Sequence, residues 1–335
     1  MSIRHGLPTL QVIGNSIPQT CYRAIKAVYE NGLHIQELSD DCQDENDQPV
    51  NSLSIDATVM IEVLDPFAQP RYSPVSFSQI GILLLEILGI KNSKVFPYKM
   101  LNFMTFNHKI NGNKNIIRDW VYTYNQRFYH YPDEGIFFFD QVTFAIKKLI
   151  KNIKTRDAII TVTIPNLDPF FQQENTPDLR EIQLRCFNDE AGILWLNPWL
   201  SWRSCNLYQN WSDNAIVLTF WLQLIAKEIA EQIGKEVRLG SYKESFASLY
   251  FDKLSLDCLE GNSETNRKSF FERFPNEEEF IRRSLTSNEA TEMLIIPQMY
   301  EILSKEKIKE HDFSETEIDF IKEIIRKIQF FEATV

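Results

Sequence analysis

The stretch WLSWRSCNLYQNWSDNAIVLT, residues 199–219, joins two elements of different kinds, and the rest of the fold can be read outward from it. Its first part continues a run of β-branched and aromatic residues, which predicts a strand over 193–202. Asp213 and Asn214 are residue types that start helices, and Gly234 is a typical residue to end one. The stretch therefore predicts a strand followed by a long helix.

More strands are predicted upstream, because short runs rich in β-branched residues are bounded by turn residues. The segment Asn188–Gly192 has the composition of a hairpin loop, and it separates a predicted strand at 181–187 from the one at 193–202. The other predicted strands are 10–13, 57–64 and 158–164.

Apolar residues at helical spacing predict helices elsewhere in the chain. The expected helices are 18–31 and 139–153, and the apolar run in 78–90 is either a buried helix or a strand, with its length favouring a helix. Residues 37–52 are acidic and polar, which we interpret as a surface loop. This order of strands and helices indicates the α+β class. Beyond residue 255 the chain is charged and favours helix, with an amphipathic pattern over 315–331. We therefore expect a main domain at 1–255 and a helical C-terminal extension at 256–335.

Charge and cysteine usage narrow the classes of function. The 335 residues carry a formal net charge of −11 with no local basic cluster, so we expect no nucleic-acid partner. The five cysteines are scattered without metal-ligand spacing, and no apolar run has the length of a membrane span. These features predict a cytoplasmic protein with neither a metal site nor a membrane contact. The usual phosphate-loop, dinucleotide and hydrolase motifs do not occur.

An ordered series of segments resembles the thymidylate synthase family, in its archaeal-type branch. The series runs PTLQVIGNSIPQT (8–20), SIDATVMIEVLDPFAQPR (54–71), WVYTYNQRFYHYP (120–132), TRDAIITV (155–162), PDLREIQLRCF (177–187), the stretch 199–219 and SLYF (248–251). It covers roughly residues 8 to 251, and its strongest element is WRS followed ten residues later by Asn214. The resemblance implies a layered α+β fold around one large mixed sheet, dimers formed through that sheet, and methylene-tetrahydrofolate as the cofactor.

The resemblance places an acid where the family has its nucleophile. A cysteine normally stands in a Pro-Cys-Leu-like turn five residues before a glutamine, and here the turn reads Pro177-Asp178-Leu179 ahead of Gln183. A carboxylate is a poor substitute for a thiolate in addition to a pyrimidine ring. Cys186 would lie about 26 Å from Asp178 along a strand. Cys205 is nearer the expected site, either as a relocated thiol or as a small buried apolar group.

The implied phosphate site has lost positive charge. The four family arginines correspond here to Ile55, Arg156, Asp157 and Arg203, the last followed by Ser204 of the WRS motif. Two of the four cations are missing, so we expect weak binding of a nucleoside monophosphate at most.

The positions that contact the ring and the sugar are partly kept. Asn214 matches the family's pyrimidine-reading asparagine, although a role at the helix start explains it as well. The sugar-contacting histidine and tyrosine fall on Ser248 and Tyr250, and Asn206 takes the place of an acid. Tyr124 matches an active-site tyrosine or is a core residue.

Glu86, inside LLLEILG, is the candidate general base. An apolar setting there would raise its pKa, whereas a solvent-facing helix end would explain it without a function.

Two functions remain open, with a third at low weight. The chain is either a catalytically silent binding or partner subunit, as a homodimer or in a heterodimer with an active paralogue, or an enzyme for a small molecule without phosphate that uses Asp178 as general acid or base. The third is folate-dependent methylation through another thiol such as Cys205.

Overall fold

The computed structural model describes residues 6–43, 49–75, 80–87, 124–129, 131, 139–164, 168, 177–263 and 267–295. The strands are β1 (Thr9–Gly14), β2 (Leu33–Gln43), β3 (Pro49–Val63), β4 (Ile159–Thr161), β5 (Leu179–Asn188), β6 (Leu194–Asn206), β7 (Val237–Leu239) and β8 (Tyr242–Phe251). The helices are α1 (Ile17–Asn31), α2 (Ile80–Ile87), α3 (Tyr124–Tyr129), α4 (Gln141–Lys151), α5 (Ser212–Ile233), α6 (Lys253–Glu260), α7 (Phe270–Arg273), α8 (Glu277–Arg282) and α9 (Ser287–Ala290), with π-helical turns at Leu207–Trp211 and Thr291–Ile295.

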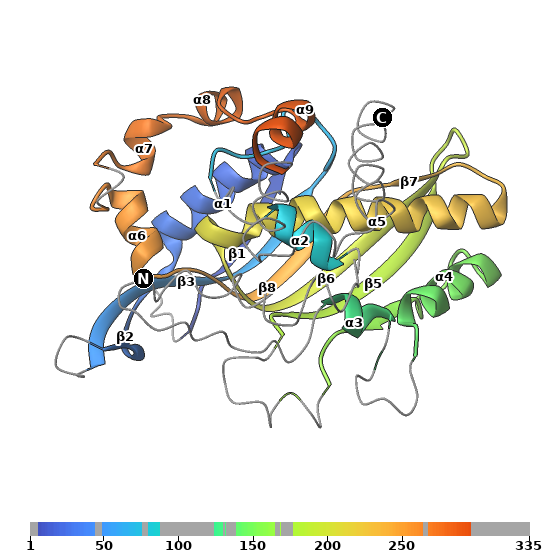
Figure 1. The fold of residues 1–335 in the computed structure, drawn as a ribbon, viewed down its shortest axis with the longest axis horizontal. Coiled ribbons are helices and arrows are strands. Elements are labelled where there is room, and N and C mark those ends of the chain that lie inside the picture. The colour runs from blue at the N-terminus through green and yellow to red at the C-terminus, as the bar shows by residue number, and fades with distance from the viewer. Residues whose placement is uncertain are drawn as a thin grey trace, which may run out of the picture.

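All eight strands belong to one mixed sheet (Figure 1). The order is β1-β3-β8-β6-β5-β4, with β2 paired to β3 and β7 paired to β6. The pairs β1–β3, β6–β7 and β6–β8 are parallel, whereas β2–β3, β3–β8, β5–β6 and β4–β5 are antiparallel. The prediction of an α+β fold around one large mixed sheet is confirmed.

The predicted hairpin of β5 and β6 is confirmed, and its loop chemistry explains it. Asp189 accepts a hydrogen bond from the backbone N–H of Ile193 at 2.9 Å, which closes the loop locally. Gly192 has φ 83°, a conformation that glycine adopts without steric cost. Because side chains alternate along β5 and β6, every second residue enters the core.

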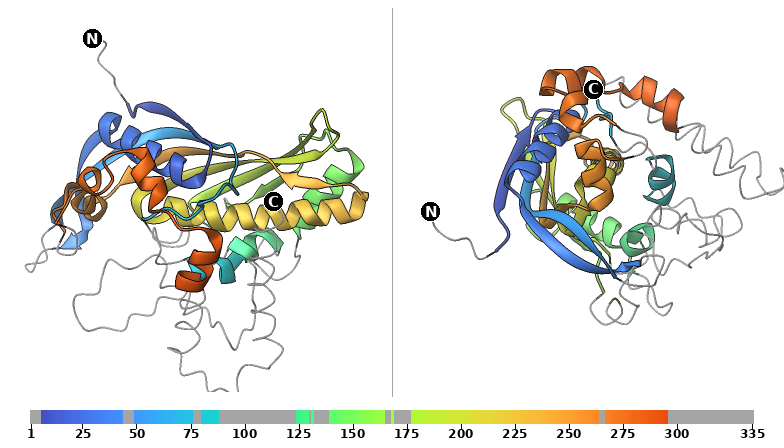
Figure 2. Two further views of the ribbon diagram at one scale, coloured as in Figure 1. Left: turned by 90° about the horizontal axis from the view of Figure 1, so that it is seen from above. Right: turned by 90° about the vertical axis from the view of Figure 1, so that its left-hand side faces the viewer.

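Helix α5 runs along one face of the sheet, as the left panel of Figure 2 shows. Its predicted end is confirmed, since Gly234 adopts the left-handed conformation with φ 65° and its N–H bonds to the Ala230 carbonyl. Its beginning is continuous with the π-helical turn, and the capping side chain is Asn206, which accepts from the N–H groups of Tyr208 and Gln209. Asp213 and Asn214 therefore lie inside the first turn of α5 and do not cap it.

The prediction of a surface loop over 37–52 is wrong for 37–43 and 49–52, the residues of this range that the structure describes. The chain instead forms β2 and the first part of β3, which pair antiparallel from Leu33 opposite Asp56 outward, with an irregularity between Ser39 and Gln43. A strand on the edge of a sheet obtains its backbone hydrogen bonds from its neighbour whatever the polarity of its side chains. Acidic composition therefore did not exclude strand structure here.

The segment after β8 is helical where it is described. Phe270, Phe274 and Phe280 are buried and pack against one another and against Tyr22 of α1, with ring centroids 5.0 to 5.9 Å apart. The predicted boundary at 255/256 falls inside α6. The amphipathic pattern over 315–331 lies outside the described residues.

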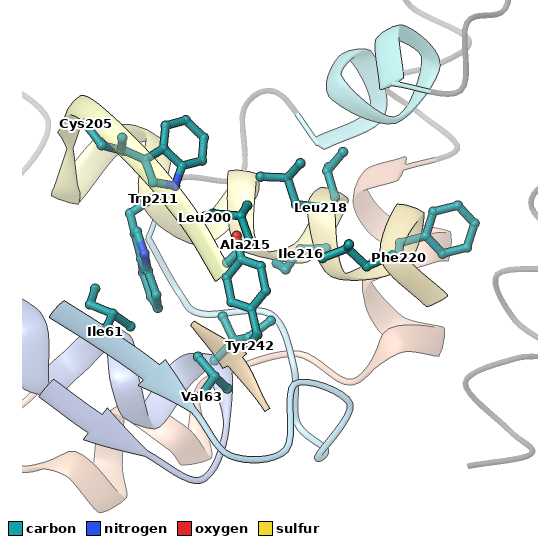
Figure 3. Close-up of a cluster of buried hydrophobic side chains, with 14 of the residues drawn as sticks. Ile61, Val63, Leu200, Cys205, Trp211, Ala215, Ile216, Leu218, Phe220 and Tyr242 are labelled. Carbon is teal, nitrogen blue, oxygen red and sulfur yellow. The ribbon is translucent and has the colours of Figure 1, made fainter. Parts of the chain in front are cut away.

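Two faces of the sheet have different environments. One face packs against α1 and α5 around buried residues such as Ile61, Leu200 and Trp211 (Figure 3). The other face carries a continuous cross-strand row, and each of its members is partly or largely exposed. The row consists of Ile13, Glu62, Lys243, Trp199, Gln183 and Ile159, which are register partners in turn. We call this set the exposed row.

Candidate functional site

Asp178, immediately before β5, is the centre of a polar cluster that includes Arg203 and Ser204 of β6. The Arg203 guanidinium donates to Asp178 Oδ1 at 2.6 Å, and the Ser204 hydroxyl donates to the same oxygen at 2.8 Å. The backbones are joined as well, because Arg203 N–H donates to the Asp178 carbonyl at 2.7 Å. The two charged side chains are 46% and 43% exposed, so the cluster is accessible from solvent.

Strand pairing explains why these residues meet. Leu179 of β5 is the register partner of Trp202 of β6, so the residues on either side of this pair are neighbours across the two strands. The register then shifts between Leu179 and Glu181, which marks the point where regular pairing begins. Asp178 lies just before the first paired residue of β5, and there its carboxylate meets the donors of Arg203 and Ser204.

Strand β8 brings Ser248 and Tyr250 beside the cluster. Ser204 is the register partner of Ser248, and Asn206 is the partner of Tyr250. Burial raises the pKa of the Tyr250 hydroxyl, the negative charge of Asp178 raises it further, and the charge of Arg203 opposes both. Tyr250 therefore lies within electrostatic range of the Asp178–Arg203 pair and stays protonated at neutral pH.

Tyr124 and Ser248, both named from the sequence, each make a hydrogen bond at this end of the sheet. The Tyr124 hydroxyl of α3 accepts from the Leu179 N–H at 3.4 Å, next to Asp178. The Ser248 hydroxyl donates to Asp56 Oδ2 of β3 at 2.7 Å, so Ser248 is held by a carboxylate on the neighbouring strand.

Cys205 and Asn214 are neighbours beneath the cluster. The Asn214 amide lies 3.9 Å from the Cys205 sulfur, and Cys205 is only 5% exposed. Figure 3 places Cys205 with the buried side chains. Burial, followed by the negative charges of Glu244 and Asp178, raises the pKa of the Cys205 thiol well above its usual value. The thiol is therefore protonated at neutral pH, which is the unreactive form.

Cys186, the other cysteine named in the sequence argument, is no better placed than Cys205. Cys186 is buried on β5, and burial raises its pKa to about 12. Eight residues of strand separate it from Asp178, which corresponds to about 26 Å. Within the described residues, Asp178 thus has no thiolate beside it.

Among the described contacts, two predicted site residues, Gln183 and Arg156, are not bonded to Asp178. Gln183 belongs to the exposed row, and its amide donates to the Arg156 carbonyl at 3.0 Å. The two residues therefore bond to each other near the pairing of β5 with the edge strand β4. Glu86 lies in α2, but its side chain is outside the described part of the structure.

Sequence reasoning missed Glu244, a carboxylate in the core below the cluster. Its oxygens accept hydrogen bonds from the hydroxyl of Tyr242 and the indole N–H groups of Trp202 and Trp211 at 2.7 to 2.8 Å. Burial raises its pKa to about 7, although these three donors act in the opposite direction. The sequence contains a signal for this position. Along β8, Glu244 stands in alternation with Tyr242 and Phe246, on the side of the strand that is buried.

Comparisons with known proteins show a likeness in fold only. No protein-family model and no curated protein matches the chain. Among solved structures, the chain is similar to the thermostable thymidylate synthase A from Bacillus subtilis, with 16% sequence identity and a TM-score of 0.44. The similarity covers 72% of this chain and 82% of that one. At this identity and score, the likeness bears on no residue of the site.

None of the described helices is long and apolar enough to cross a lipid bilayer.

Proposed function

We propose that this chain is a diverged relative of the thymidylate synthases that binds a ligand or a partner subunit without carrying out the family's thiol chemistry. The ordered series of segments from 8 to 251 supports the kinship. The observation that carries the proposal is the hydrogen-bonded cluster of Asp178, Arg203 and Ser204. The Asp178 carboxylate accepts the hydrogen bonds of Arg203 and Ser204, which the resemblance assigns to a phosphate. Asp178 itself stands at the position expected for the nucleophile.

Electrostatics support this interpretation. The Asp178 carboxylate neutralises the Arg203 guanidinium, and Ile55, which stands at another expected arginine, is a buried aliphatic residue. A phosphate entering this site would have to displace Asp178 and then meet its negative charge. The cluster therefore disfavours an anionic ligand.

The described residues do not fit one-carbon transfer from methylene-tetrahydrofolate. That chemistry requires a soft nucleophile to activate the pyrimidine, and the nearby thiol of Cys205 is buried and held in its protonated form. We derive no reaction step through the folate.

The partner we propose is a second copy that covers the exposed row. Ile13, Met60 and Trp199 are each at least 40% exposed on this face. Apolar side chains that are exposed on several neighbouring strands form the kind of surface that a protein interface covers. Pairing with an active paralogue through the same face is the alternative partner.

A second candidate function is proton transfer by Asp178 on an uncharged small molecule. It is favoured by the 46% exposure of the Asp178 side chain together with the neighbouring protonated Tyr250 hydroxyl, which can donate a hydrogen bond. Neither group requires a thiol.

The first experiment compares thermal shifts with deoxyuridylate for the wild-type chain, Asp178→Asn and Asp257→Asn. Asp257 is also paired with a cation, Lys253, but on α6, and it serves as the matched control. We expect a shift only for Asp178→Asn, because that variant gives Arg203 and Ser204 a neutral neighbour and allows them to bind an anion by mass action.

An activity assay separates the two candidate functions. We expect no conversion of deoxyuridylate with methylene-tetrahydrofolate by the wild-type chain. Conversion by the pure protein would overturn the proposal of a silent subunit. If another activity is found, its loss in Asp178→Asn at unchanged stability would favour the proton-transfer function.

A further inference from the structure

A pocket of about 870 Å³ lies at the end of the sheet opposite the Asp178 cluster. It is bounded by β7, the C-terminal half of α5, the β5–β6 hairpin and the segment that follows β3. Figure 1 shows β7, the end of α5 and the hairpin on the right-hand side of the molecule. Trp195 of the pocket and Arg203 of the cluster are eight residues apart on β6, which corresponds to about 26 Å. The pocket is therefore separate from the candidate site, and its volume is in the range of small-molecule sites.

The pocket walls supply flat apolar surface. Phe67, Phe187 and Trp195 line it, and Phe187 is 49% exposed. The Trp195 ring is held in place because its indole N–H donates to Asp189 at 2.8 Å. A rigid aromatic side chain of this kind favours a ligand with a flat face.

Each charged side chain that lines the pocket has a partner in the protein, including Asp65, which accepts from the Phe67 N–H, and Lys227, which pairs with Glu231. Arg238 forms an ion pair with Glu236 at 2.6 Å, and its guanidinium lies 6.0 Å from the centre of the Trp195 ring. Asp189 accepts from both Trp195 and the backbone of Ile193. Because these groups already have hydrogen-bond or ion-pair partners, the pocket has little to offer a charged ligand and is better suited to a neutral one.

Two side-chain amides retain hydrogen-bonding capacity. Gln223 accepts from the Leu239 N–H at 3.1 Å through Oε1, and its Nε2 donates to none of the described residues. Asn197 donates to the Trp195 carbonyl at 3.0 Å through Nδ2, and its Oδ1 accepts from none of them. Each amide is thus oriented by one bond to the protein and keeps a polar atom for another partner.

Gly240 makes room for this arrangement. A Cβ at position 240 would lie 2.7 Å from Asn197 Oδ1, so any other residue there would displace the amide. The pocket therefore combines aromatic walls, compensated charges and two oriented amides, one with a spare donor and one with a spare acceptor.

We infer that this pocket binds a neutral, flat heteroaromatic molecule whose edge carries both hydrogen-bond donors and acceptors. Such a molecule stacks on the aromatic walls and uses its edge to satisfy Gln223 Nε2 and Asn197 Oδ1. The inference rests on this pocket alone and is independent of the function proposed for the Asp178 cluster.

Isothermal titration of the full chain tests the inference with adenosine and uridine as neutral heteroaromatic probes and benzoate as a flat anion without such an edge. We expect adenosine or uridine to bind with a Kd of about 1 mM or lower, and benzoate not to bind. Gln223→Glu keeps an acceptor for Leu239 N–H but removes the free donor, so it should weaken binding about tenfold. Gln232→Glu, on the same helix but outside the pocket, should leave binding unchanged.

Titration of the Asp178→Asn variant shows whether the nucleosides bind in the pocket or at the Asp178 cluster. Binding that survives Asp178→Asn and weakens in Gln223→Glu supports the inference. Binding that is lost in Asp178→Asn and unchanged in Gln223→Glu would place the ligand in the other site and overturn it. Failure of both nucleosides to bind, or equal weakening in Gln223→Glu and Gln232→Glu, would also overturn it.

Discussion

Asp178 and Glu244 are two carboxylates close to the same cysteine, and their surroundings give them different roles. Asp178 is about half exposed and paired with a guanidinium, so it competes with any anion for Arg203. Glu244 is 1% exposed and has three neutral donors, and no cation bonds to it within the described part of the chain. Since a buried charge without a counter-ion is costly, Glu244 takes up a proton more readily than an ordinary glutamate.

The raised pKa of Glu244 predicts a stability that falls as pH rises. Burial moves its pKa from 4.5 to about 7 in the folded chain, so the folded state holds more protons than the unfolded state between these values. The contribution is complete below about pH 4.5 and is lost by about pH 7. Its size is on the order of 3 kcal/mol in the free energy of unfolding.

Urea unfolding over this pH range measures the effect. Glu244→Gln should flatten the dependence, because its side chain does not titrate, whereas Glu260→Gln on α6 should leave the slope as in the wild type. Equal slopes for the wild-type chain and Glu244→Gln would show that Glu244 is not the group responsible.

At the scale of elements, β6 and α5 could be predicted because their local signals and their tertiary contacts agree. The hairpin loop at 188–192 and the glycine at 234 have the conformations that their residue types favour. The second half of β3 was predicted as a strand at 57–64, whereas β2 and the first part of β3 were not, because their pairing is a contact that the acidic composition of 37–52 does not reveal.

The same reasoning applies to the candidate site. The resemblance named both Asp178 and Arg203 as site residues, but the ion pair between them was not predicted. The bond from Ser248 to Asp56 and the three donors of Glu244 join strands far apart in sequence, and no local spacing indicates them.

Gly234 provides a test of the α5 end. Its φ of 65° is unfavourable for residues with a Cβ, while a built Cβ would meet no atom within 4 Å. Gly234→Ala should therefore lower the free energy of unfolding by about 1 kcal/mol through the backbone alone, and Gly234→Asn should cost less because asparagine tolerates this conformation. Urea midpoints compare the two variants, and an unchanged midpoint for Gly234→Ala would contradict the assignment.

At the scale of the whole molecule, the sheet has one face packed by helices and another with partly exposed apolar side chains. The exposed row crosses six strands, and within it Lys243 pairs with Glu62 at 3.2 Å. Compensated charges between apolar residues suit a surface that becomes buried on association. This is the physical basis for proposing a second copy on this face.

Trp199 is the residue whose change tests that proposal. It is 43% exposed in the middle of the row, so Trp199→Glu should place a charge in the centre of the interface and shift the dimer to monomers. Leu254→Glu is the matched control, because Leu254 is 45% exposed but lies on α6. Sedimentation velocity measures the oligomeric state, and circular dichroism confirms that each variant is folded. A wild-type chain that remains monomeric at micromolar concentration would contradict the homodimer and favour an unlike partner. Equal dissociation in both variants would locate the interface elsewhere than the exposed row.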